Sequence, residues 1–97
     1  IRAERAQLGI LCCSTGIGMS MAANKFPGIR AALVRYEDEA ALTRRHNNAN
    51  ILCLGGFHTT PYEAPILARS FIKNTFEGGR HARRVGKFTD WEHEDNI

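Results

Sequence analysis

Cysteine is scarce in this sequence, and its placement does not suit disulfide bonds. Cys12, Cys13 and Cys53 are the three cysteines among 97 residues. Because two of them are adjacent and the total is odd, we do not expect a disulfide framework. Reduced thiols in a cytoplasmic protein are the better interpretation. No Cys and His spacing resembles a zinc site, so no metal is expected either.

Long hydrophobic runs, repeats and low-complexity tracts are also lacking. No apolar stretch approaches the roughly 20 residues that a membrane-spanning helix needs, so we expect no membrane partner. A chain of this length forms one domain at most, and residues 1–97 are assigned to a single domain. Because Ile1 is followed by a charged, alanine-rich stretch, we interpret residues 2–7 as the end of a helix whose amino-terminal part is missing.

Aromatic residues are missing from the main basic cluster. The net charge is +3 and the pI is about 9.0, and the excess is concentrated in Arg80, His81, Arg83, Arg84 and Lys87. Proteins that bind single-stranded nucleic acid stack bases on aromatic side chains, and none lies between these arginines. The cluster therefore favours a small phosphorylated ligand over a nucleic-acid partner, which stays as a third hypothesis.

What the sequence does contain is a regular alternation of strand and helix signals. Strands are predicted over 8–13, 29–34 and 51–54. The first predicted helix follows the first strand and ends near Lys25, and the second spans 37–46. The third runs from a capping box at 60–63 to Phe76, and a short fourth helix covers 80–88. The tail over 89–97, with Trp91 isolated in it, is expected to be loosely held or docked on a neighbour. This order predicts right-handed parallel crossovers and an α/β fold.

A glycine turn between the first strand and the first helix is the candidate functional loop. Backbone N–H groups at such a helix start lack partners and can hold negative charge, here those of Ser14, Gly16 and Gly18. Thr15 could orient or donate to the same oxygen. Cys13, where the strand ends, could serve as a nucleophile or a base.

The connectivity separates this loop from three other candidates. Cys13 and Thr15 follow a strand, whereas His46, Arg80 and Arg84 follow helices that return to the starts of the strands. A strand of about five residues separates those edges by roughly 17 Å. If all five residues serve one site, it must form across a symmetric dimer.

Together these side chains suit proton abstraction beside a carbonyl group on a phosphorylated substrate. Two arginines four residues apart on a helix suit a phosphate, and His46 can transfer protons near neutral pH. Aldose–ketose isomerisation requires this set and neither a metal nor a redox cofactor. Each residue alone has an ordinary structural interpretation, Cys12 and Cys53 as buried strand residues above all. Their co-occurrence favours function.

Three stretches carry a resemblance to a known family. They read GILCCSTGIGMSMAANKFPGIRAAL over 9–33, RRHNNANILCLG over 44–55 and FEGGRHARRV over 76–85. In this order they closely resemble the ribose-5-phosphate isomerase B family, which includes the galactose-6-phosphate isomerase subunits. The resemblance implies a Rossmann-like αβα sandwich with a parallel sheet, of which this chain covers roughly the carboxyl-terminal two-thirds. It also implies a homodimer, or a dimer of dimers, with sites between subunits.

The resemblance also implies roles for individual residues. Cys13 matches the base that moves a proton between C1 and C2, and Thr15 with the backbone of 16–18 matches the loop that stabilises the enediolate. His46 matches the group that opens the furanose ring, and Asn47 matches a contact to a sugar hydroxyl. Arg80 and Arg84 match the residues that hold the phosphate.

The chain departs from the family pattern at several positions. Nothing matches the family's amino-terminal strand with its Asp-His pair, and Phe57 follows Gly55-Gly56 where many members carry an arginine. His46-Asn47-Asn48 resembles the galactose-6-phosphate branch. Two alternatives therefore stand beside a pentose-phosphate isomerase: an isomerase of a six-carbon sugar phosphate, and a phosphosugar-binding paralogue without catalysis.

Overall fold

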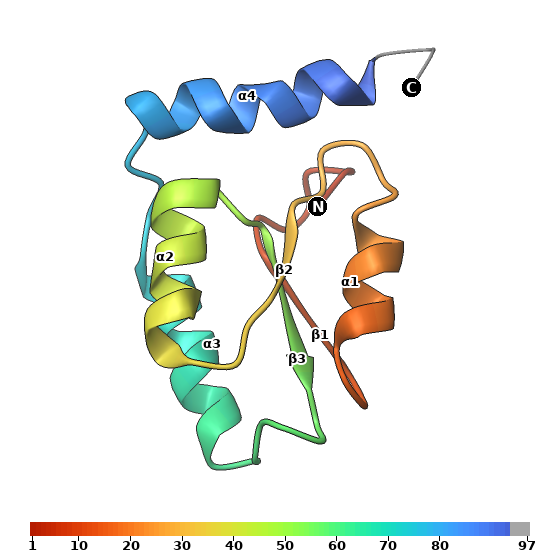
Figure 1. Ribbon diagram of the computed structural model, residues 1–97, viewed down its shortest axis with the longest axis vertical. Helices are drawn as coiled ribbons and strands as arrows, with labels where there is room; N and C mark the ends of the chain where they lie inside the picture. The colour runs from red at the N-terminus through yellow and green to blue at the C-terminus, as the bar shows by residue number, and fades with distance from the viewer. Residues whose placement is uncertain (94–97) are drawn as a thin grey trace.

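Three parallel strands form a sheet that four helices surround (Figure 1). The computed structural model describes residues 1–93. The strands are β1 (Gly9–Cys13), β2 (Ala31–Leu33) and β3 (Ile51–Gly55), and the helices are α1 (Ile17–Ala23), α2 (Glu37–Asn47), α3 (Glu63–Lys73) and α4 (Arg80–Glu92). The predicted alternation and the α/β class are confirmed, but residues 2–7, interpreted as the end of a helix, form turns and bends. Among the described residues, no helix is long and apolar enough to cross a bilayer.

The central strand is β3, because the strand order is β1-β3-β2. All five of its residues are buried, and they alternate between the two faces of the sheet. Leu52 and Leu54 belong to the core cluster with Phe71 of α3, whereas Cys53 belongs to the cluster with Ala23 of α1. A strand covered by helices on both faces is continuously apolar, which explains the sequence Ile-Leu-Cys-Leu. Helix α1 thus covers one face, and α2 and α3 cover the other.

The outer edge of β2 is closed by a side chain. The Nδ2 group of Asn24 donates to the carbonyl oxygen of Ala31 (2.9 Å), and its Oδ1 accepts from the N–H of Ala31 (2.8 Å). The strand is shorter than the predicted 29–34, because the N–H of Ile29 closes a turn on the carbonyl of Phe26 and that of Arg30 donates to the side chain of Asn50.

The predicted capping box of α3 is confirmed. The N–H of Thr60 donates to the Glu63 carboxylate (3.1 Å), and the N–H of Glu63 donates to Oγ1 of Thr60 (3.1 Å). The helix begins at Glu63, so Pro65 falls in its first turn. The N–H of Ala64 already donates to the carbonyl of Thr60 (3.0 Å), and Pro65, which has no N–H, omits the next bond of this series. It ends at Lys73, earlier than the predicted Phe76.

The carboxyl-terminal helix differs most from the prediction. Helix α4 continues to Glu92 instead of ending near Phe88, so the expectation of a loosely held tail is wrong for residues 89–92. The alternative, docking of the tail on a neighbour, stays a prediction. Phe88 and Trp91, three residues apart, pack with their ring centroids 5.9 Å apart and their planes tilted by 59°, and the Glu92 carboxylate accepts a hydrogen bond from the N–H of Gly28 (3.0 Å). Residues 94–97 lie outside the described residues. Figure 1 shows α4 crossing the end of the molecule opposite to the tip of β1.

Candidate functional site

The loop after β1 places the thiol where the sequence predicts it. Cys13 is the last residue of β1, and its Sγ accepts a hydrogen bond from the N–H of Gly16 (3.0 Å). The N–H of Ile17 donates to Oγ1 of Thr15 (3.2 Å). Gly16 has a φ of 79°, a conformation that favours glycine. The turn therefore holds both the thiol and the hydroxyl by backbone donors at the start of α1.

A second loop fixes this turn from the side of β3. The N–H of Gly56 donates to the carbonyl of Cys13 (2.8 Å), and the N–H of Phe57 donates to the carbonyl of Ser14 (2.8 Å). Phe57 is 75% exposed beside this loop. The two strand ends thus form one hydrogen-bonded platform at the carboxyl edge of the sheet.

The thiols differ in environment. Cys53 is completely buried on β3, and burial, followed by the neighbouring cysteines, raises its pKa to about 11. Cys13 is partly buried and Cys12 is exposed, so the expectation that Cys12 is a buried strand residue is wrong, whereas the same expectation for Cys53 is confirmed.

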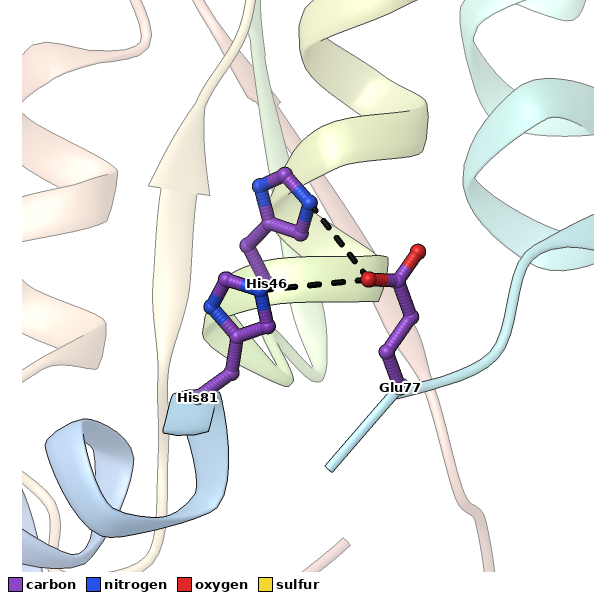
Figure 2. A group of neighbouring side chains, drawn as sticks. All are labelled: His46, Glu77 and His81. Carbon is purple, nitrogen blue, oxygen red and sulfur yellow. Dashed lines mark ion pairs between the residues drawn. The ribbon is translucent and has the colours of Figure 1, made fainter. Parts of the chain in front are cut away.

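At the opposite end of the sheet, His46 belongs to a cluster of three side chains. Nε2 of His46 lies 3.6 Å from Oε1 of Glu77, and Nε2 of His81 lies 3.8 Å from the same oxygen. The two imidazole rings stack with centroids 4.3 Å apart and planes at 11°. Figure 2 shows both rings turned toward the Glu77 carboxylate, with the second nitrogen of His46 directed away from it.

Glu77 is itself held in place by Arg45. Its Oε2 accepts from Nε of Arg45 (2.7 Å), and its backbone N–H donates to the Arg45 carbonyl (3.0 Å). The hydrogen bond from Arg45 is the main reason why the pKa of Glu77 is lowered. The pKa of His81 is lowered first by desolvation and then by the charges of His46 and Arg80. At neutral pH the cluster is therefore an anionic carboxylate against two stacked rings, of which His81 stays neutral.

Two histidines and a glutamate are also a ligand set for zinc, and their ligand atoms lie within 4.8 Å of one another. A metal ion lies in the plane of each imidazole that binds it. Because these two planes are nearly parallel and stacked, their in-plane lone pairs run side by side and do not converge on one point. The rings would have to leave their stack to share an ion, so this arrangement does not fit a metal centre.

The predicted phosphate-binding arginines lie on α4. Arg80 and Arg84 are exposed and one turn apart, and neither has an ion-pair partner among residues 1–93. Asn47, at the end of α2, lines a cavity of about 520 Å³ between β2, α2 and α4, to which Phe88 and Trp91 also contribute. His46, Asn47 and the start of α4 therefore lie at one end of the molecule.

The predicted separation of the candidates is confirmed. Figure 1 shows the tip of β1, with Cys13 as its last residue, at one end and the end of α2 with α4 at the other. Within one chain the thiol loop is thus not brought together with His46, Arg80 and Arg84. Sequence reasoning missed Glu77 and His81 as partners of His46, although both lie in the quoted stretch 76–85. Their signal was the i, i+4 spacing of an acid and a histidine.

The fold and these side chains define a Rossmann-like α/β protein with a thiol-bearing glycine loop at the carboxyl edge of its sheet. A family model described as Ribose/Galactose Isomerase matches residues 1–88, and the chain belongs to this family. The predicted family is therefore confirmed.

Individual relatives agree with this assignment. The chain is 52% identical over 87 residues to the probable ribose-5-phosphate isomerase B of Mycoplasma genitalium, covering 90% of this chain and 57% of that protein. A crystal structure of the ribose-5-phosphate isomerase B from the same organism, with bound ribulose 5-phosphate, superposes with a TM-score of 0.90 at 48% identity and covers 96% of this chain and 61% of the other. The crystal structure of the ribose 5-phosphate isomerase from Thermotoga maritima superposes with a TM-score of 0.89 at 47% identity, covering 92% of this chain and 61% of the other. The chain thus spans less than two thirds of the length of these proteins.

Proposed function

We propose that the protein carrying this chain is an aldose–ketose isomerase that interconverts a phosphorylated aldose and ketose, of the ribose 5-phosphate and ribulose 5-phosphate type. The observation that carries the proposal is the thiol of Cys13, held by the N–H of Gly16 beside Thr15 at the carboxyl edge of the sheet. Relatives named ribose-5-phosphate isomerase B, one of them with bound ribulose 5-phosphate, support the same reaction class.

In the proposed reaction the open-chain aldose loses its C2 proton to the sulfur of Cys13. The C2–H electron pair forms the C1–C2 double bond, and the carbonyl pair moves to O1. Thr15 and the backbone N–H groups of Ser14 and Gly18 stabilise O1, while the N–H of Gly16 holds the sulfur of Cys13. The O2 hydroxyl then passes its proton to O1 and becomes the new carbonyl, while the electron pair of the C1–C2 double bond takes the proton back from the thiol at C1. Such donors act because they already point at the developing charge. No redox cofactor enters this balance.

The remaining predicted residues would bind the rest of the substrate. Arg80 and Arg84 hold the phosphate, Asn47 contacts a sugar hydroxyl, and His46 opens the furanose ring before proton transfer. Because these groups lie at the opposite end of the sheet from Cys13, the site is completed by a second subunit in a symmetric homodimer or a dimer of dimers. The three free cysteines fit a reducing compartment such as the cytoplasm.

A paired cysteine substitution in the full-length protein tests the proposal. Cys13→Ser should lower kcat for ribose 5-phosphate by about 100-fold or more, the contribution typical of a general base. Cys12→Ser is the matched control, since its thiol is exposed on the neighbouring position, and it should change kcat less than twofold. Equal rates in the two variants would rule out Cys13 as the base.

The same assay separates the alternatives. A galactose-6-phosphate isomerase subunit of Streptococcus pyogenes is 39% identical to this chain, so six-carbon aldose phosphates are tested beside ribose 5-phosphate. Binding of both classes in calorimetry without turnover of either would favour a phosphosugar-binding protein that has lost catalysis, in which Phe57 replaces an arginine.

A further inference from the structure

The geometry points to Glu77 as a positioning residue for His46, with His81 as the stacked ring that holds the imidazole in the orientation Glu77 selects. This inference rests on the proposed function and deepens it, because it assigns the cluster to the opening of the sugar ring and not to the later proton transfer. The juxtaposition that carries it is the Glu77 carboxylate facing Nε2 of both rings at 3.6 and 3.8 Å.

The carboxylate determines which nitrogen of His46 carries the proton. A neutral imidazole has one N–H and one lone pair, and the neighbours of the ring decide their places. The negative charge of Glu77 favours the proton on Nε2, the nitrogen that faces it. Nδ1, which Figure 2 shows directed away from Glu77, is then the acceptor that is free to meet a substrate hydroxyl.

The stacked ring removes the remaining freedom of His46. His81 is buried, and its ring lies nearly parallel to that of His46 at 4.3 Å. A partial rotation of the His46 ring about χ2 would lose this stack, and a flip by half a turn would take Nε2 away from Glu77. Arg45 anchors Glu77 from the other side at 2.7 Å. Charged groups near His46 thus come from α2, from the segment before α4 and from α4 itself, where Arg80 and Arg84 lie.

An imidazole fixed in this way suits ring opening. When a furanose opens, the C1–O4 bond breaks with its electron pair going to O4, and the O1–H pair becomes the new carbonyl bond. One proton leaves O1 and one reaches O4, so Nδ1 of His46 can accept the first and return it as the second. The imidazole ends as it began, and the step requires no further reactant.

A four-carbon substrate separates ring opening from isomerisation. In erythrose 4-phosphate the phosphate occupies O4, so the sugar cannot close to a furanose. One relative of this chain, 39% identical, is named D-erythrulose-4-phosphate isomerase, which motivates this probe. A residue that serves only ring opening should matter for ribose 5-phosphate and not for the tetrose phosphate.

The test compares Glu77→Gln with Asp38→Asn in the full-length protein. Both replace an exposed carboxylate by an amide, and Asp38 lies at the far end of α2. Glu77→Gln should lower kcat for ribose 5-phosphate about tenfold, a part of the contribution of an acid–base group, and should change kcat for erythrose 4-phosphate less than twofold. Arg45→Gln should act in the same direction but more weakly. Asp38→Asn should leave both rates unchanged.

Equal losses on both substrates, or no loss on ribose 5-phosphate, would overturn the inference while leaving the isomerase proposal intact. An inactive wild type would instead remove the isomerase proposal. Nitrogen-15 NMR of the imidazole nitrogens decides the inference in either case. At a pH where the His46 ring carries one proton, we expect that proton on Nε2 in the wild type and a mixture of tautomers in Glu77→Gln. A proton on Nδ1 in the wild type would refute the role of Glu77.

Discussion

Gly55 is the position at which β3 comes closest to the loop that carries Cys13 and Thr15. A Cβ atom added there would lie 2.9 Å from Cα of Thr15 and nearer still to its carbonyl group, whereas ordinary contacts begin at 3.4 Å. The atoms in the way belong to the backbone, so no side chain can rotate to make room. In Gly55→Ala the loop must therefore move by at least about half an ångström away from β3.

The size of the effect follows from this displacement. Overpacking of this kind costs about 1–3 kcal/mol in the free energy of unfolding, and we expect the upper part of this range because the obstacle is rigid. A shift of about 1 Å in a reacting group can cost about 100-fold in rate. Since Cys13 and Thr15 lie on the displaced loop, we expect kcat for the aldose phosphate to fall by about that factor.

Gly56→Ala is the matched control. A Cβ atom at Gly56 would lie 3.7 Å from the carbonyl oxygen of Cys13, an ordinary contact. We expect its free energy of unfolding in urea to stay within about 0.5 kcal/mol of the wild type and its kcat within twofold. If Gly55→Ala and Gly56→Ala had the same free energy of unfolding and the same kcat, the close approach of β3 to the loop could not be what positions the thiol.

The remaining predictions concern thiol reactivity and acid stability. In the folded protein at pH 8, iodoacetamide should modify Cys12 and Cys13 but not Cys53, because burial raises the pKa of Cys53 to about 11. Mass spectrometry of the peptides measures the extent of modification at each cysteine. Rapid labelling of Cys53 would contradict its place in the core. The pKa of Glu63 is lowered by hydrogen bonds from Thr60, so its folded-state pKa lies below the unfolded value and its contribution is present at neutral pH and lost as the pH falls below about 4.3. In urea unfolding, the free energy of unfolding of Glu63→Gln should therefore be lower than that of the wild type at pH 7, and this difference should disappear by pH 3. A difference that does not change with pH would count against the capping box.

The main elements could be predicted because local signals determine them. The five residues of β3 are apolar and covered on both faces, and the capping box of α3 depends on residues three apart in sequence. The separation of Cys13 from His46 also followed from connectivity, since consecutive parallel strands must be joined by helices that return to the starting edge. These properties need no knowledge of contacts between distant residues.

The parts that were missed depend on tertiary contacts. Helix α4 continues past Phe88 because Trp91 packs on that ring and Glu92 reaches the N–H of Gly28, 64 residues earlier in the chain. The partners of His46 were missed for a similar reason: Glu77 and His81 reach it only because the segment before α4 is hydrogen bonded to the end of α2. A sequence pattern shows that an acid and two histidines are present, but not that the segment before α4 packs against the end of α2.

The amide group of Asn24 has a consequence for how the sheet can grow. It is hydrogen bonded to both the backbone N–H and the carbonyl oxygen of Ala31 on the outer side of β2. An additional strand could therefore not form its backbone hydrogen bonds with Ala31 there. Within residues 1–93, β1 pairs with β3 alone, and its outward-facing peptide groups have no such guard. Any additional strand, from this polypeptide or another, would therefore join at β1, and a single asparagine gives the sheet a direction of extension.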